Sequence, residues 1–293
     1  MTELHPRGVF CASLTPLQAD LTPDHGLFAE HCHYLLGEGC DGIALLGTTG
    51  EANSFSTGER EALLEAAVRA GVAPSRLLPG TGVAALTDTV ELTKHALSLG
   101  VETVVMLPPF YYKDVTEDGL FAAYAAVVER VADPRLKVVL YHIPQVSAVP
   151  IAFPLIERLR AAFPGVFTGI KDSAGQLANM EALVECFSVL AGADPLMLPL
   201  LRKGGAGCIT ATSNLMAKDL AFVHRHFADA GRAAEVEAAQ ARVVAERNRT
   251  AGPVQIAMTK ALTAARTGNE GWNRVRPPLV PLSAERAAAL RAA

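Results

Sequence analysis

Lys171 is the residue whose type and position most directly suggest chemistry. It ends an apolar run that begins at Phe167 and has the composition of a buried β-strand, and the polar pair Asp172-Ser173 follows it. Apolar surroundings disfavour the ammonium form of a lysine, and Schiff-base formation with a carbonyl substrate requires a neutral amine. The alternative is a lysine whose stem packs among apolar groups while its amine reaches solvent. Other residues that end apolar runs favour the first interpretation.

Hydroxyl groups stand at the ends of two further apolar runs. The turn Gly47-Thr48-Thr49-Gly50 follows Asp41–Leu46. Its amides and hydroxyls could hold the carboxylate of a 2-keto acid, and its glycines permit a close approach. Tyr141 ends another run, and its phenol could serve as general acid and base, relayed through Thr48. The alternatives are an ordinary strand-to-helix turn and a half-buried core tyrosine.

The elements that must position these residues alternate along the chain. Eight short apolar runs are separated by amphipathic segments, and this pattern predicts a parallel sheet with helices between its strands. Eight such units in this length favour a (β/α)8 barrel over a doubly wound sheet. The expected strands are Gly8–Leu14, Asp41–Leu46, Arg76–Gly82, Glu102–Leu107, Lys137–His142, Phe167–Lys171, Ser188–Gly192 and Cys208–Thr212.

In such a barrel the carboxyl ends of the strands converge on one mouth, where active sites are built. Thr48, Thr49, Tyr141 and Lys171 should therefore gather there. Tyr111-Tyr112, which follows the fourth expected strand, should lie at the same mouth, either in the site or as packing at its rim.

Several helices carry recognisable start signals. Asp24 precedes a helix that should end near Gly37–Gly39, Ser56 and Glu59 form a capping box, and Thr87 is expected to cap a helix containing Val90. Beyond about Lys218 the pattern becomes purely helical. It predicts helices at Ala217–Ala230, Ala233–Arg249, Pro253–Thr267 and Ser283–Ala293. We therefore divide the chain into a barrel domain, residues 1–216, and a C-terminal helical region, residues 217–293, packed on it.

Composition and charge exclude several classes of protein. Of the 293 residues, 50% are hydrophobic and 19% are charged, which allows a sizeable core and argues against disorder. The net charge of −4 gives no basic surface for nucleic acid. The five cysteines lack Cys-x-x-Cys spacing, which is typical of a reducing cytosol. Residues 1–6 lack a signal-peptide pattern and no apolar run could span a bilayer, so we expect a cytoplasmic protein without a membrane partner.

Two motifs suggest a cofactor, and both are weak. His31-Cys32-His33 resembles a metal cluster, but residues i and i+2 of a helix do not share a face, so no metal is expected. Gly80–Ala85 matches the dinucleotide pattern GxGxxA. The acidic residue that should support it, Glu102, precedes its strand instead of ending it. A dinucleotide enzyme is therefore a minor alternative, and we expect no cofactor beyond a covalent Schiff base on Lys171.

Three motifs together resemble one family. Gly47-Thr-Thr-Gly-Glu51, Tyr141-His-Ile-Pro144 and Gly169-Ile-Lys171, in this order and spacing, are similar to the dihydrodipicolinate synthase and N-acetylneuraminate lyase superfamily. The resemblance spans Gly8 to about Asn214. Its members are class I, metal-independent lyases of the (β/α)8 fold that use pyruvate.

The resemblance assigns a role to each matching residue. It implies that Lys171 forms the Schiff base with pyruvate, that Tyr141 transfers protons, and that Thr48 and Thr49 of the turn beginning at Gly47 bind the pyruvate carboxylate. Ile209 matches a strand-eight residue near the keto acid. Tyr112, or else Tyr111, matches a tyrosine that synthases lend across a dimer interface. The resemblance also implies a homo-oligomer, a dimer or more commonly a homotetramer.

Two departures from the family pattern bear on the second substrate. Synthases usually carry an arginine two residues after the proline of the tyrosine motif, where it grips the carboxylate of aspartate semialdehyde; here Val146 replaces it. Sialic-acid lyases usually show an Asp-Glu pair after the strand-seven glycine, and this chain has Asp194-Pro195 instead. Candidate contacts to the second substrate are Gln145, His142, Ser173 and Asp194.

The sequence therefore predicts a lyase that makes or breaks a carbon–carbon bond between pyruvate, or another 2-keto acid, and an aldehyde. The main alternative is a 4-hydroxy-tetrahydrodipicolinate synthase that condenses pyruvate with aspartate semialdehyde. A 2-keto acid dehydratase that uses the same iminium is a third enzymatic possibility.

Overall fold

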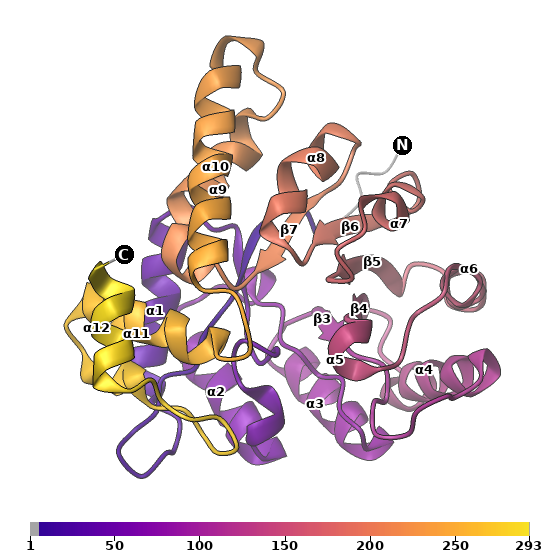
Figure 1. Cartoon of the computed structure of the whole chain (residues 1–293). Helices are drawn as coiled ribbons and strands as arrows, with labels where there is room; N and C mark the ends of the chain where they lie inside the picture. Colours follow the sequence, from indigo (N-terminus) through magenta and orange to yellow (C-terminus); the bar gives the residue numbers. More distant parts are fainter. Residues whose placement is uncertain (1–5, 293) are drawn as a thin grey trace.

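A parallel sheet curved around a central axis forms the middle of the molecule, with helices around it (Figure 1). The computed structural model describes residues 6–292. The sheet has the strand order β2-β1-β7-β6-β5-β4-β3, and each neighbouring pair is parallel. Its strands are β1 (Gly8–Ala12), β2 (Gly42–Ala44), β3 (Thr103–Met106), β4 (Lys137–His142), β5 (Phe167–Asp172), β6 (Ser188–Ala191) and β7 (Gly207–Thr210). This arrangement confirms the TIM-barrel fold.

The prediction of eight regular strands was wrong at one place. The expected third strand, Arg76–Gly82, pairs with its neighbours only through isolated bridges to β2 and β3. The amide of Leu78 donates to β2 and the amide of Thr81 donates to β3, each over 2.9 Å, so this segment still fills the gap between them. Pro79 has no amide hydrogen to give, which interrupts a regular ladder. The ring therefore closes through an irregular segment.

Alternation along the strands separates two layers of core. Side chains of one set point into the barrel, and the intervening ones point out toward the helices. On β4, Val139 and Tyr141 belong to the inner layer while Val138 and Leu140 belong to the outer one. By the same alternation Lys171 faces inward and its neighbours on β5 face outward. The barrel interior is filled by Phe10, Ala12, Ala44, Leu78, Val105, Val139, Tyr141, Ile143, Leu190, Ala206 and Ile209.

Most predicted helices are present, and their starts show why. Asp24 caps α1 by accepting from the amide of Leu27, and Ser56 and Glu59 form the predicted capping box of α2. The prediction that Thr87 caps α3 was wrong, because the N-cap is Ala85, two residues earlier, and Thr87 lies inside the helix. Around the barrel lie α1 (His25–Gly37), α2 (Thr57–Arg69), α3 (Leu86–Ser98), α4 (Glu117–Val131), α5 (Pro144–Ser147), α6 (Phe153–Ala162), α7 (Leu177–Glu181) and α8 (Met197–Arg202).

The C-terminal part of the chain is helical, as predicted. It contains α9 (Ser213–His226), α10 (Ala233–Arg249), α11 (Gln255–Thr267) and α12 (Ala284–Ala292), and α9 and α10 project together from the barrel (Figure 1). The boundary proposed between residues 216 and 217 falls inside α9, where Met216 has a non-helical backbone. Residues 1–5 and 293 of the two proposed domains lie outside the described part.

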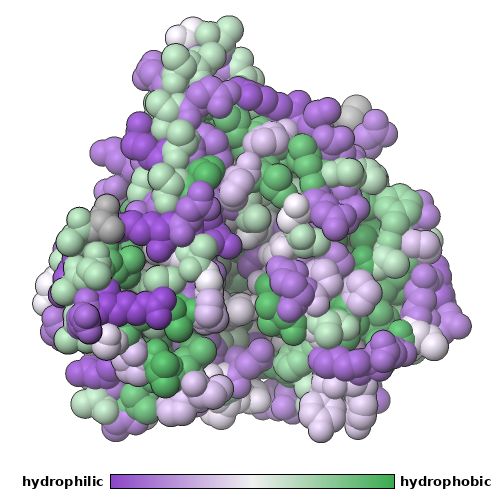
Figure 2. Space-filling model, viewed as in Figure 1, coloured by the Kyte–Doolittle hydropathy of each residue, from purple (hydrophilic) through white to green (hydrophobic). Residues whose placement is uncertain are grey.

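The surface on the side of this view has a mixed character. Hydrophilic and hydrophobic residues are interspersed over it (Figure 2). Among the helices of residues 6–292, none combines the length and the apolar character needed to cross a membrane. Within the same residues, His, Cys, Asp and Glu side chains do not gather in threes as a metal site would require.

Candidate active site

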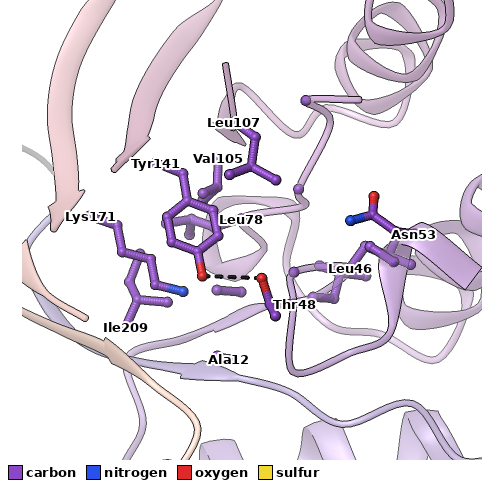
Figure 3. Close-up of a pocket in the computed structure, with 16 residues that line it drawn as sticks. Ala12, Leu46, Thr48, Asn53, Leu78, Val105, Leu107, Tyr141, Lys171 and Ile209 are labelled. Atoms are coloured by element: carbon purple, nitrogen blue, oxygen red, sulfur yellow. Dashed lines mark hydrogen bonds between the residues drawn. The ribbon is translucent and has the colours of Figure 1, made fainter. Parts of the chain in front are cut away.

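Lys171 and Tyr141 lie side by side at the mouth of the barrel. They are partners in the parallel register of β4 and β5, and both point inward. The Nζ atom of Lys171 lies 4.0 Å from the centroid of the Tyr141 ring. Only 5% of Lys171 is exposed, and its amine and the Tyr141 phenol point into the same space (Figure 3). The structure thus brings together the two residues with the strongest predicted roles.

Thr48 reaches the same space from the turn after β2. Its Oγ1 atom lies 3.3 Å from the phenol oxygen of Tyr141, within hydrogen-bonding distance (Figure 3). The turn is fixed by its own backbone, because the amide of Glu51 donates to the carbonyl of Thr48 over 3.1 Å. The next amide, of Ala52, donates to Gly47 over 3.2 Å. A lysine and a phenol from two neighbouring strands and a hydroxyl from the turn after a third strand therefore form one continuous group.

The cavity beside these residues has mainly apolar walls, and the space between them, including the part open to solvent, amounts to about 440 Å³. Gly47, Thr48, Tyr141, Lys171 and Ile209 line it, as the sequence led us to expect. Thr49 is half-buried in the same turn but is not part of the lining. Such a mixture of apolar walls and a few convergent polar groups is typical of small-molecule sites.

Asn53 also lines this cavity and was missed in the sequence. It belongs to the short 3-10 helix η1 (Ala52–Ser54), and in Figure 3 it lies on the other side of Thr48 from Tyr141 and Lys171. Its place directly after the turn at Thr48 was the one available signal.

The glycines of the supposed dinucleotide motif have a packing role. A side chain at Gly80 would collide with the carbonyl of Leu46, and one at Gly82 would collide with the backbone of Leu107. These glycines therefore allow the irregular third segment to lie close against the ends of β2 and β3. This close approach accounts for the motif without a nucleotide.

Tyr111 and Tyr112 do not line the cavity. They are 73% and 74% exposed, and their rings contact each other edge to face with centroids 5.3 Å apart. The loop that carries them is fastened by Lys113, whose amine donates to the carbonyl of Phe110 and, over 2.9 Å, to that of Ser147. The pair is thus presented at the surface from an anchored loop.

The residues proposed to contact a second substrate do not lie together, and those nearest the mouth of the barrel are on α5. Gln145 lies on α5 and donates its amide to the carbonyl of Ser173 over 2.8 Å, which links the ends of β4 and β5. Val146, at the position where synthases carry arginine, is 61% exposed. Both are near the mouth of the barrel, but neither lines the cavity.

His142 faces away from the barrel axis, one residue beyond Tyr141. It lines a different cavity together with Asp172, its partner in the strand register. Its Nδ1 atom accepts from the amide of Ile151 over 3.1 Å. Burial lowers the pKa of His142, although the Asp172 carboxylate opposes this. Burial raises the pKa of Asp172, and the amide of Ala174 and His142 oppose it. His142 is therefore separated from the Lys171 cavity by the wall of the barrel.

Asp194 lies in a buried polar network that does not reach the cavity. Its carboxylate accepts from the hydroxyl of Thr212 over 2.9 Å, and Arg247 lies 3.9 Å from it. Gln240 of α10 donates to its backbone carbonyl. Burial raises the pKa of this carboxyl, an effect that the neighbouring hydroxyls and Arg247 oppose. The structure gives Asp194 the surroundings of a residue that joins η3 (Asp194–Leu196) to α10.

A sequence profile described as the dihydrodipicolinate synthetase family matches residues 5–293. The chain belongs to this family. It is 39% identical to a DapA-like lyase of Chloroflexus aurantiacus over 98% of this chain and 96% of that one.

Solved structures of family members have the same fold. Dihydrodipicolinate synthase of Agrobacterium tumefaciens superimposes with a TM-score of 0.85 at 32% identity, covering 97% of each chain. YagE of Escherichia coli K12, solved in complex with pyruvate, gives a TM-score of 0.88 at 25% identity over 98% of this chain and 96% of that one. The family assignment confirms the prediction of a lyase of the aldolase type.

Proposed function

We propose that the protein forms a Schiff base between Lys171 and pyruvate and uses it to make or break a carbon–carbon bond to an aldehyde. The observation that carries the proposal is the contact of Lys171, Tyr141 and Thr48 in one apolar cavity. The pyruvate in the structure of its relative YagE supports the choice of keto acid.

The groups present suit each step of this reaction. The amine of Lys171 adds to the ketone carbon, and the resulting hydroxyl leaves as water after it receives a proton from the phenol of Tyr141. The iminium then withdraws electrons as the phenolate of Tyr141 removes a methyl proton, with the hydroxyl of Thr48 relaying protons to and from the phenol. The enamine carbon so formed attacks the aldehyde, whose oxygen takes the proton from the phenol. Water finally releases the product and restores the free amine.

The amides of the turn beginning at Gly47 suit the carboxylate of pyruvate. Gly47 and Thr48 line the cavity beside the amine of Lys171, and Thr49 follows them in the turn. We propose that these residues hold the carboxylate and that Ile209 packs against the keto acid. No metal or other cofactor takes part in this scheme.

For the second substrate we propose an uncharged aldehyde. Val146 offers no positive charge, and the amine of Lys113 is engaged by two carbonyls. A bidentate clamp for a second carboxylate is therefore lacking at the position where the family's synthases have one. Gln145, fastened to Ser173, remains as a polar contact near the mouth.

We further propose a cytoplasmic homo-oligomer in which the exposed Tyr111-Tyr112 pair meets a second copy, with Tyr112 completing its site. The exposed rings support an interface. A monomeric dihydrodipicolinate synthase variant is among the similar structures, so sedimentation velocity must decide the oligomeric state.

Trapping with borohydride tests the main proposal. The protein is incubated with pyruvate, reduced, digested and analysed by peptide mass spectrometry. We expect a reduced pyruvyl adduct on Lys171 that is missing in Lys171→Ala. An adduct at another lysine, or none, would exclude the proposed role of Lys171.

The synthase alternative has its own test. If the protein were a 4-hydroxy-tetrahydrodipicolinate synthase, the untreated enzyme supplied with pyruvate would turn over aspartate semialdehyde faster than neutral aldehydes of similar size. We expect the reverse order. Val146→Arg should then improve kcat/KM for aspartate semialdehyde and lower it for the neutral aldehydes.

A further inference from the structure

A fully buried ion pair joins the C-terminal helices to the turn that carries Thr48. The amine of Lys260, on α11, contacts the carboxylate of Glu51, and both side chains are 0% exposed. The two residues are 209 positions apart in the chain. Burial lowers the pKa of the Lys260 amine, and the Glu51 carboxylate opposes this effect. The pair has no part in the reaction proposed above.

The hydrogen bonds of the pair are directed at backbone on both sides. The second carboxylate oxygen of Glu51 accepts from the amide of Arg276 over 2.9 Å, and Lys260 also donates to the carbonyl of Arg274 over 2.6 Å. Glu51 is thus held by two segments of the C-terminal region at once. A carboxylate with two such partners has little freedom to turn.

The backbone of Glu51 adopts a conformation that it would rarely choose alone. Its φ of 58° and ψ of 29° lie in the left-handed region, which is costly for a residue with a side chain. On its amino-terminal side Gly50 is fixed, because its carbonyl accepts from the hydroxyl of Thr15 over 2.8 Å. Glu51 is therefore the point at which the chain turns from the Thr48 segment into η1, and its side chain holds that turn in place.

We propose that Lys260 and Glu51 are positioning residues. Through their contacts with the C-terminal region, they fix the Thr48 turn in the geometry that carboxylate binding needs. The inference rests on the proposed function of that turn. A buried ion pair adds little net stability over a well-packed apolar pair, but it imposes a specific geometry. The amides of the turn and the hydroxyl of Thr48 must be placed within about 0.5 Å to bind a small anion well. A C-terminal contact of this kind supplies that precision.

The experiment compares Lys260→Met, the double variant Glu51→Gln/Lys260→Met, and a control, Leu262→Ala. Leu262 lies two residues further along α11 and packs on Met258 and Leu290, away from the Thr48 turn. The double variant removes both charges, so it should fold even if Lys260→Met alone does not. Leu262→Ala weakens the same helix without touching Glu51.

Two readouts are measured on each variant. The first is the pyruvate concentration that gives half-maximal borohydride trapping on Lys171. The second is deuterium uptake by the peptide that contains Gly47–Ala52, which does not depend on pyruvate.

We expect the double variant to need at least about tenfold more pyruvate and to take up deuterium in this peptide at least about tenfold faster, with Leu262→Ala like wild type in both. Unchanged half-saturation and unchanged uptake in the double variant would overturn the inference. An equal effect of Leu262→Ala would also overturn it, since any loosening of the helix would then suffice. If wild type itself forms no adduct, the proposed function fails, and deuterium uptake alone decides whether the pair fixes the turn.

Discussion

Lys171 and Lys260 are both buried, with 5% and 0% exposure, but their surroundings differ completely. Lys260 lies on α11, a helix that contributes no residue to the lining of the cavity. Its amine contacts the carboxylate of Glu51 and a backbone carbonyl. Lys171 faces a cavity and a tyrosine ring, and it forms no ion pair within residues 6–292. A cation that is paired on burial is fixed in place, whereas an amine kept beside an empty space is available for reaction. Burial alone therefore does not distinguish a structural lysine from a reactive one.

The largest effect is expected from Lys171→Met. Exchange of the pyruvate methyl protons with deuterated water, followed by NMR, reports the enamine without requiring the aldehyde. We expect the rate to fall by at least about 10³-fold, because the proposed nucleophile is lost. The free energy of unfolding should stay the same or rise, since no ion pair is broken. Residual exchange near the wild-type rate would remove the distinction between the two lysines.

Lys260→Met should show the opposite pattern. Urea unfolding is expected to give a loss of about 3–5 kcal/mol, because the Glu51 carboxylate remains buried without its partner. The double variant Glu51→Gln/Lys260→Met should recover most of that loss. At saturating pyruvate, the methyl-exchange rate of the double variant should stay within a few-fold of wild type. A double variant no more stable than Lys260→Met would contradict this account of the pair.

Tyr141→Phe tests the polar surroundings of Lys171. The rate of methyl exchange should fall by about 10²-fold, because the phenol that we propose to move protons is lost while the ring against Lys171 remains. Thr48→Val should have a smaller effect, about tenfold, since it removes only the hydroxyl next to that phenol. If Thr48→Val were the more damaging change, Thr48 and not Tyr141 would be the main proton-transfer group.

The smallest effect is expected on stability, from the ion pair between Arg276 and Glu59. Arg276 donates two hydrogen bonds to Glu59 and lowers the pKa of that carboxyl from its ordinary value of 4.5 to about 2. A lowered pKa stabilises the folded state above pH 4.5, and this contribution is lost as the pH falls from 4.5 to 2. Since Glu59 is partly exposed, we expect about 1–2 kcal/mol.

Unfolding by urea at several pH values between 2 and 6 measures this contribution. Glu59→Gln should make the free energy of unfolding depend less on pH in that range. The matched change Glu117→Gln, in the exposed pair with Arg158, should leave the curve nearly unaltered. Equal curves for wild type and Glu59→Gln would show that Arg276 does not stabilise the charged carboxyl.

Local signals in the sequence predicted the fold and the centre of the site. Apolar runs that stop at a polar residue identified the strand ends, and the convergence of strand ends in a barrel then brought Lys171, Tyr141 and Thr48 together. The failures have physical causes. Pro79 interrupts the hydrogen-bond ladder in the third segment. The apolar pattern that predicts a β-strand does not show that one backbone amide hydrogen is absent. Thr87 looked like a cap, but Thr87 lies inside the helix that Ala85 precedes.

Contacts between residues far apart in the chain could not be predicted. Asp194 follows a strand, as a site residue would, yet its surroundings depend on Gln240 and Arg247 of a helix almost fifty residues further on. The Glu51–Lys260 pair had one faint signal, a single lysine within the apolar run Ile256–Leu262. Nothing in that run indicates which carboxylate it meets.

The buried pair also sets an order of events during protein synthesis. Glu51 is added to the growing chain 209 residues before its partner, a delay of roughly 10 to 40 s at ordinary elongation rates. During this time the segment that carries Thr48 has no counter-charge for its glutamate and must stay in contact with water. The turn that carries Thr48 is therefore expected to be among the last parts of the barrel to mature. A nascent chain arrested before Lys260 should hold all three candidate catalytic residues and still bind pyruvate poorly.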